Sequence, residues 1–182
     1  ASALGGARHV ILIDRSASMS TLDEAGDDGR PITRLERAKQ HAISLVEAFR
    51  EPSFFRGGQR DEAMIIAFDA GAEVRQPFTA DKALLRRVIN AIEPTDAPSR
   101  LDEAMRLGGA YAELQLDEER GLVATDVAEM HLFSDGRLAD ADDILINPGV
   151  PRAYTRIGAA NTGNTAITAV RASRAFDAPG SV

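Results

Sequence analysis

The stretch HVILIDRSAS, residues 9–18, decides the fold class of this chain. Residues 10–13 are all apolar, whereas a strand with one solvated face alternates between apolar and polar side chains. The run therefore predicts a central strand of a parallel sheet, buried on both faces. Asp14, Ser16 and Ser18 follow where this strand ends, and open α/β sheets bind their ligands beyond the carboxyl ends of their strands.

The rest of the chain alternates between short apolar runs and segments of helical periodicity, which predicts a mainly parallel sheet covered by helices. Strands are expected at 9–14, 63–68, 73–78, 129–133, 152–157 and 165–170, and helices at 34–50, 81–92, 101–116 and 140–145. Pro77 places the strand at 73–78 at an edge of the sheet, because proline cannot donate to a strand ladder.

Composition and charge exclude several classes of protein. The 182 residues are 44% hydrophobic, which suffices for one continuous core. The net charge of −7 and the absence of tryptophan argue against non-specific binding of nucleic acid, which needs a cationic surface and stacking side chains. The longest apolar run is far shorter than the roughly 20 residues of a membrane span, and no signal peptide is recognised.

Polar side chains also follow the strand predicted at 129–133. Asp135 lies directly after it, and Ser99 lies in a loop before a predicted helix. If the two strands are neighbours, these residues meet Asp14, Ser16 and Ser18 at one edge of the sheet. Two carboxylates and three hydroxyls, with no His or Cys, suit Mg²⁺ or Mn²⁺ first and Ca²⁺ second.

This pattern resembles the metal-ion-dependent adhesion site of von Willebrand factor A domains. The residues that carry the resemblance are Asp14-x-Ser16-x-Ser18, Ser99 and Asp135. It implies a three-layer, Rossmann-like α/β fold with one antiparallel edge strand. It also implies a bound cation with Ser16, Ser18 and Ser99 as direct ligands. A Glu or Asp carboxylate of a protein partner would complete the coordination shell of this cation. The family usually has Thr at position 99, and serine keeps the oxygen but not the methyl group that restricts the rotamer.

Within the family, three segments most resemble bacterial membrane-anchored aerotolerance (Bat) proteins: DRSASM at 14–19, EPTDAPSRL at 93–101 and FSDGR at 133–137. The resemblance implies a domain over 8–170, flanked by linkers at 1–7 and 171–182 that continue into a longer, membrane-anchored protein. The fragment itself is expected to be soluble, with the periplasmic or extracytoplasmic side favoured. The sliding C-terminal helix of many adhesion domains is not expected here.

Plainer interpretations of the same residues stay open. Asp14 and Asp135 are either metal ligands or ordinary loop caps. Arg15, Arg100 and Arg137 either form a cationic rim that attracts an acidic partner or pair with nearby acids.

Two further groups of residues are interpreted as structural. The acidic loop at 23–28 is expected to be solvated rather than to hold a second cation, because its spacing matches no calcium-binding loop. His9, His41 and His131 are scattered over two strands and a helix, and they are expected to have structural roles.

Three functions compete for this sequence: a cation-dependent binding module, a structural domain of a membrane assembly, and a Mg²⁺-dependent phosphoryl-transfer or hydrolytic enzyme. Haloacid-dehalogenase-type enzymes need a second Asp where Ser16 stands. They also use a Lys that follows a later strand, whereas Lys39 and Lys82 both lie in predicted helices. The chain has no G-x-S-x-G elbow, P-loop or G-x-G-x-x-G motif. We therefore expect the binding module and no enzyme activity.

Overall fold

A five-stranded sheet lies at the centre of the fold in the computed structural model, which describes residues 6–50, 60–113, 128–140 and 152–158. In spatial order the strands are β5 (Ala72–Thr79), β4 (Glu62–Phe68), β1 (Arg8–Asp14), β6 (Glu129–Ser134) and β7 (Arg152–Arg156). β1 pairs in parallel with β4 and β6, and β6 with β7, whereas β5 runs antiparallel to β4. The predicted mostly parallel sheet with one antiparallel edge strand is confirmed.

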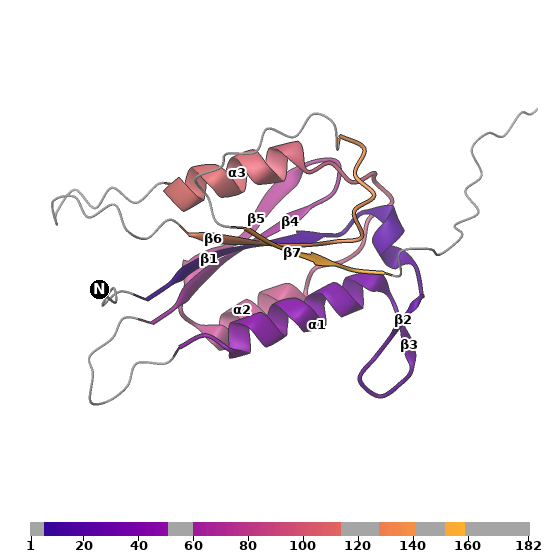
Figure 1. Cartoon of the computed structure of the whole chain (residues 1–182), viewed down its shortest axis with the longest axis horizontal. Helices are drawn as coiled ribbons and strands as arrows, with labels where there is room; N and C mark the ends of the chain where they lie inside the picture. The colour runs from indigo at the N-terminus through magenta and orange to yellow at the C-terminus, as the bar shows by residue number, and fades with distance from the viewer. Residues whose placement is uncertain (1–5, 51–59, 114–127, 141–151, 159–182) are drawn as a thin grey trace, which may run out of the picture.

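Helices cover both faces of this sheet. α1 (Arg34–Glu47) and α2 (Lys82–Asn90) lie on one face, and α3 (Asp102–Glu113) lies on the other (Figure 1). The three-layer, Rossmann-like architecture is thus confirmed. The helix predicted at 140–145, the strand predicted at 165–170 and the end of the helix predicted at 101–116 lie outside the described residues.

The apolar run in β1 reflects burial on both faces of the sheet. Ile11 and Ile13 pack into the core beneath α1 and α2, whereas Val10 and Leu12 pack into the core beneath α3. All four side chains are fully buried. A strand that meets a core on each side has no solvated face, and its sequence therefore shows no alternation.

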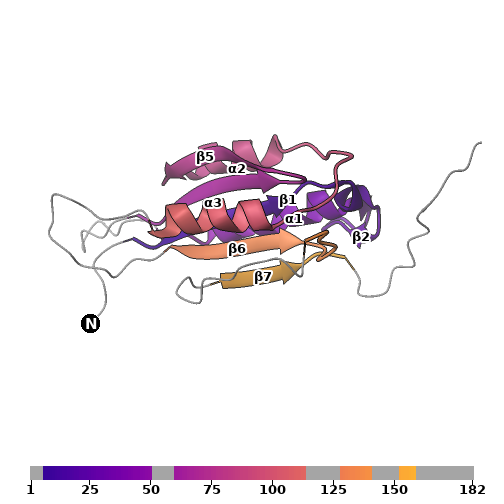
Figure 2. The ribbon, with the colours of Figure 1, turned by 90° about the horizontal axis from the view of Figure 1, so that it is seen from above.

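The order of the strands places a topological switch point at β1. The chain passes from β1 to β4 and β5 on one side, and later reaches β6 and β7 on the other (Figure 2). The crevice beyond the carboxyl ends of β1 and β6 is where sheets of this type bind ligands. We call this end of the sheet the carboxyl edge.

The segment between β1 and α1, where the sequence predicts neither a strand nor a helix, contains short regular elements. It holds a short 3₁₀ helix, η1 (Ala17–Ser20), and a hairpin of two short strands, β2 (Glu24–Ala25) and β3 (Pro31–Ile32). The hairpin turns at Gly29, whose φ of 77° is accessible to glycine at little cost. Elements of two to four residues are too short to show a hydrophobic period, which explains why the sequence did not reveal them.

Within the described ranges, no helix combines the length and apolar character needed to cross a bilayer.

Candidate metal centre

The carboxylate of Asp14 organises the carboxyl edge. Asp14 ends β1 and is fully buried. Its Oδ1 accepts a hydrogen bond from the Ser16 backbone N–H at 3.0 Å. Its Oδ2 accepts from the hydroxyls of Ser99 at 2.8 Å and Ser134 at 2.7 Å. One carboxylate therefore holds the end of β6 and the loops that follow β1 and α2 against one another.

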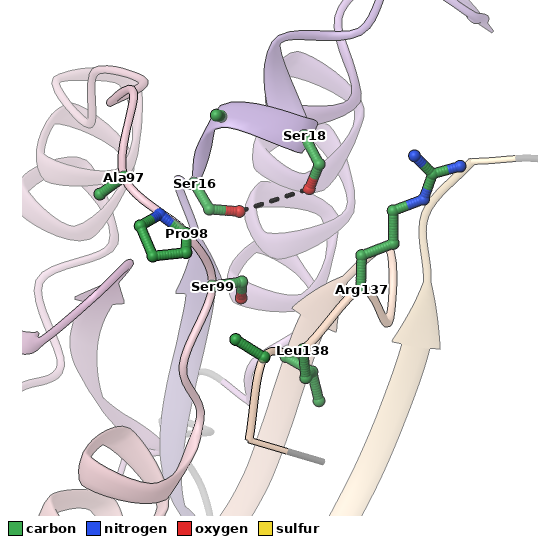
Figure 3. A pocket seen from close by; sticks show the side chains of 9 residues that line it. Ser16, Ser18, Ala97, Pro98, Ser99, Arg137 and Leu138 are labelled. Atoms are coloured by element: carbon green, nitrogen blue, oxygen red, sulfur yellow. Dashed lines mark hydrogen bonds between the residues drawn. The ribbon is translucent and has the colours of Figure 1, made fainter. Parts of the chain in front are cut away.

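Three serine hydroxyls converge above this carboxylate. Ser16 Oγ and Ser18 Oγ lie 3.4 Å apart, and both residues line a pocket of about 470 Å³ together with Ser99 (Figure 3). Because the Ser99 hydroxyl gives its proton to Asp14, its oxygen lone pairs remain available for a cation. The rest of the lining is apolar apart from Arg137.

The loop that carries Ser99 is tied to the loop after β6. The Ala139 N–H donates to the Ser99 carbonyl at 2.8 Å. Asp140 accepts from the N–H groups of Leu101 and Asp102 at 2.8–3.0 Å, at the start of α3. Burial disfavours the charged form of Asp140, but these donors outweigh burial and lower its pKa. The position of Ser99 is thus fixed from both sides.

Asp135 lies at the carboxyl edge and forms an ion pair with a buried arginine. Its Oδ1 accepts from the Arg137 N–H at 3.0 Å, and its Oδ2 accepts from Arg34 Nη1 at 2.7 Å. Each oxygen thus accepts a hydrogen bond from the described part of the chain, and a carboxylate has about four lone-pair sites in all. Asp135 therefore keeps lone pairs for a cation or a cation-bound water, although its side chain is 2% exposed and it is not among the residues that line the pocket.

Arg34, at the first position of α1, bridges two acids. Its guanidinium also binds Asp23, with Nε 2.9 Å from Oδ1. The pKa of Arg34 is raised, first by hydrogen bonding to Asp23 and then by Asp135, against the opposing effect of burial. Gly158, with a φ of 85°, covers the guanidinium so closely that a Cβ atom there would lie 2.8 Å from Arg34 Nε.

Sequence reasoning missed two residues of this edge, Arg34 and Ser134. Arg34 lies four residues before Ala38 on the buried stripe of α1, and a charge at such a position needs a buried partner of opposite sign. Ser134 stands beside Asp135 in the quoted sequence, but nothing local reveals that its hydroxyl turns back to Asp14.

The remaining charges near the edge are largely paired. Arg15 binds Asp69 at 2.9 Å and Glu73 at 3.4 Å, which favours the local-pairing interpretation for this residue. Arg137 lines the pocket, with its Nε 3.9 Å from Asp135 Oδ2, and the side chain of Arg100 is exposed.

The acids of the loop at 23–28 differ in exposure: the side chains of Asp27 and Asp28 are 85% and 61% exposed, as expected for a solvated loop, whereas that of Asp23 is 14% exposed. Their ion pairs are Asp23–Arg34, Glu24–Arg37, Asp27–Arg37 and Asp28–Arg30.

The donor set fits a hard divalent cation. The structure links Asp14, Ser16, Ser18 and Ser99 through hydrogen bonds and places Asp135 at the next strand end. These oxygens are the ligand type of Mg²⁺, Mn²⁺ and Ca²⁺. Their assignment as ligands stays a prediction.

Comparisons with solved structures agree with this fold. The chain is similar in fold to the conserved hypothetical protein BatB from Bacteroides thetaiotaomicron, at 20% identity and a TM-score of 0.52, over 74% of this chain and 56% of that one. It is also similar to an aerotolerance-related membrane protein from Bacteroides fragilis NCTC 9343, at 18% identity and a TM-score of 0.51, over 84% of this chain and 68% of that one. The chain thus spans little more than half the length of the BatB structure.

No curated protein matches the sequence. The sequence model of the von Willebrand factor type A domain, however, matches residues 9–137, which is more than half of the chain. The strand order and the hydroxyls at the carboxyl edge agree with that match. The chain therefore belongs to the von Willebrand factor type A domain family.

Proposed function

We propose that this domain is a binding module that presents a divalent cation, Mg²⁺ first, to a carboxylate of a protein partner. The observation that carries the proposal is the buried Asp14 carboxylate beneath the hydroxyls of Ser16, Ser18 and Ser99. A buried carboxylate whose neighbouring serines line an open pocket is well suited to a cation that stays accessible from outside.

In this proposal the three serine hydroxyls contact the cation directly, and Asp14 and Asp135 contact it directly or through water. Mg²⁺ requires near-octahedral oxygen coordination and commonly keeps water ligands. One of those waters can be exchanged for a Glu or Asp of the partner. Mn²⁺ and Ca²⁺ are the alternatives, since both accept the same kind of oxygen ligand.

The composition of the pocket favours binding over catalysis. Its described lining consists of hydroxyl and apolar side chains and Arg137, and a general base for activating a nucleophile is not among them. Arg137 is a cation at the pocket wall, which favours an acidic partner. We therefore propose that Arg137, at the rim of the pocket, attracts the carboxylate of the partner.

The cellular setting is part of the same proposal. The motif resemblance to Bat-type proteins supports a longer, membrane-anchored protein in which residues 8–170 form the binding domain, with the extracytoplasmic side favoured. The Bacteroides fragilis relative is described as an aerotolerance-related membrane protein. The net charge of −7 supports a protein partner rather than nucleic acid.

Water-proton relaxation with Mn²⁺ tests both the cation and the carboxylate. Bound Mn²⁺ that keeps exchangeable water should enhance relaxation, and acetate, as the smallest carboxylate probe, should reduce that enhancement by displacing water. Arg137→Gln should weaken the acetate effect while leaving Mn²⁺ binding in place, and Arg75→Gln, on β5, is the matched control. Mn²⁺ binding that acetate leaves unchanged would contradict the carboxylate half of the proposal.

A further inference from the structure

Two histidines and a glutamate meet at the end of the sheet opposite the carboxyl edge. His9 Nδ1 lies 3.0 Å from His131 Nε2, and Glu129 Oε2 lies 3.8 Å from the same His131 nitrogen. One ligand atom from each of the three residues falls within 4.8 Å of the other two. We call His9, Glu129 and His131 the amino-edge cluster.

Strand pairing explains why residues so distant in sequence meet there. His9 of β1 is the register partner of Glu129 of β6. His131 follows two residues later and therefore projects from the same face of the sheet. His9 precedes Asp14 by five residues, or about 16 Å along the strand. The amino-edge cluster is therefore separate from the candidate metal centre.

The surroundings keep the two imidazoles neutral and oriented. Both histidines are 8% exposed. Burial lowers the pKa of His9 and of His131, and it outweighs the opposing effect of Glu129. The His9 ring stacks on Phe49 with ring centroids 4.5 Å apart. A neutral imidazole carries one nitrogen lone pair, which is the form that binds metals.

The cluster is partly open to solvent and carries negative charge. The Glu129 side chain is 46% exposed, so an ion can enter from that side. The negative charge of Asp61 favours the protonated form of His9 and so opposes the lowering of its pKa, whereas the positive charge of Arg50 lowers that pKa further. Both Asp61 oxygens already accept backbone N–H groups, from Ala7 and Arg50. Asp61 therefore contributes charge near the site but is not counted as a ligand.

We propose that the amino-edge cluster is a second metal site, for Zn²⁺ or a similar first-row transition ion. Two imidazoles and one carboxylate form a ligand set typical of zinc sites that keep one position open for water. Ligand atoms around tetrahedral zinc, with bonds of about 2.0–2.1 Å, lie roughly 3.3 Å apart. Two of the three separations, 3.0 and 3.8 Å, bracket that value, and the third is within 4.8 Å.

Metal binding requires one proton to move. In the His9–His131 contact one ring nitrogen carries the hydrogen and the other accepts it. When a metal binds between them, the donating ring must release that hydrogen and carry its N–H on its other nitrogen. The ring thus changes tautomer without changing its charge.

The two sites should select different cations. The carboxyl edge offers oxygen ligands, which suit Mg²⁺, whereas imidazole suits Zn²⁺, Co²⁺ and Ni²⁺. Excess Mg²⁺ should therefore occupy the carboxyl edge without competing at the amino-edge cluster.

Calorimetric titration with Zn²⁺ in excess Mg²⁺ tests the proposal, with ring nitrogen NMR of the histidines as an independent reading. The wild type should bind one equivalent of Zn²⁺ and shift the ring signals of His9 and His131. His131→Gln should lose at least 10-fold in affinity, and Glu129→Gln, at a half-exposed position, should bind more weakly without a folding defect. His41→Gln is the matched control, because His41 is exposed and outside the cluster.

Each outcome decides the question. Loss of Zn²⁺ binding in His131→Gln and weakening in Glu129→Gln, with His41→Gln unchanged, supports the site. Absence of Zn²⁺ binding by the folded wild type overturns it, and so does unchanged affinity in both cluster variants. Mg²⁺ binding at the carboxyl edge is independent of these results, so the failure of one site leaves the other standing.

Discussion

Arg34 and Asp135 form a buried ion pair, with Arg34 Nη1 2.7 Å from Asp135 Oδ2 and side chains that are 1% and 2% exposed. The pair joins the first residue of α1 to the loop after β6. Separating a buried ion pair is strongly destabilising, because it leaves an unpaired buried charge. Arg34 therefore holds the Asp135 carboxylate, which we predict to face the cation, in one position. The Arg34 guanidinium thus stabilises the position of Asp135 at the carboxyl edge.

Replacing Arg34 should therefore destabilise the fold. Arg34→Met is expected to lower the free energy of unfolding by about 3–5 kcal/mol, because it leaves Asp135 and Asp23 without their buried partner. Arg86→Met, on α2, is the matched control, since its ion pair with Glu47 is about half exposed on both sides and should contribute less than about 1 kcal/mol. Urea unfolding of both variants measures the difference, and similar losses in the two would refute the structural role of Arg34.

Position 99 should tolerate a change of side chain that keeps the hydroxyl. Ser99→Ala removes the oxygen that donates to Asp14 and lines the pocket, so Mg²⁺ affinity should fall at least about 10-fold. Ser99→Thr keeps the oxygen and adds a rotamer-restricting methyl, so its affinity should stay close to that of the wild type. Calorimetry compares the two, and equal affinity in both variants would exclude Ser99 as a ligand.

Ser134 should matter although it does not line the pocket. Its hydroxyl donates to Asp14 and accepts from the Gly136 N–H at 3.1 Å. Ser134→Ala is expected to cost about 1–3 kcal/mol of stability and about 10–100-fold in cation affinity. Ser44→Ala, on the exposed face of α1, is the control and should be near neutral. Unfolding and Mg²⁺ titration of the two variants provide the test.

Asp140 should make the free energy of unfolding depend on pH in the acidic range. Its pKa is lowered by the N–H groups at the start of α3, so its stabilising effect is complete above the ordinary Asp pKa of about 3.9 and is lost as the pH falls through the lower folded value. Asp140→Asn is expected to be about 1 kcal/mol less stable at pH 7, with the gap closing in strong acid. Unfolding curves at pH 7, 5 and 3 measure it, and a gap independent of pH would contradict this account.

The sequence predicted those features that leave a local pattern. The apolar run of β1 and the Asp14-x-Ser16-x-Ser18 spacing are both local patterns, and the predicted elements that fall within the described residues lie within a few residues of their predicted ranges. Helix ends were less certain: the helix predicted at 81–92 spans Lys82–Asn90, with Asp81 as its cap. Terminal turns fray, and apolar periodicity does not mark where hydrogen bonding stops.

Contacts between distant residues were not predictable from one sequence. Ser134 meets Asp14 across 120 positions, and His131 meets His9 across 122. Only the strand register brings them together, and no local composition encodes that register. The histidines therefore looked scattered along the chain, although two of them lie in one cluster.

Titration of the folded domain with Mg²⁺ tests most directly whether the carboxyl edge binds a divalent cation. We predict one equivalent of bound Mg²⁺ and a saturable rise in stability, about 2.7 kcal/mol at 100 times the dissociation constant. Both should be lost in Ser16→Ala/Ser18→Ala and retained in Ser44→Ala. A folded wild type that neither binds nor is stabilised by Mg²⁺ or Mn²⁺, or a double variant that binds equally well, would contradict the account.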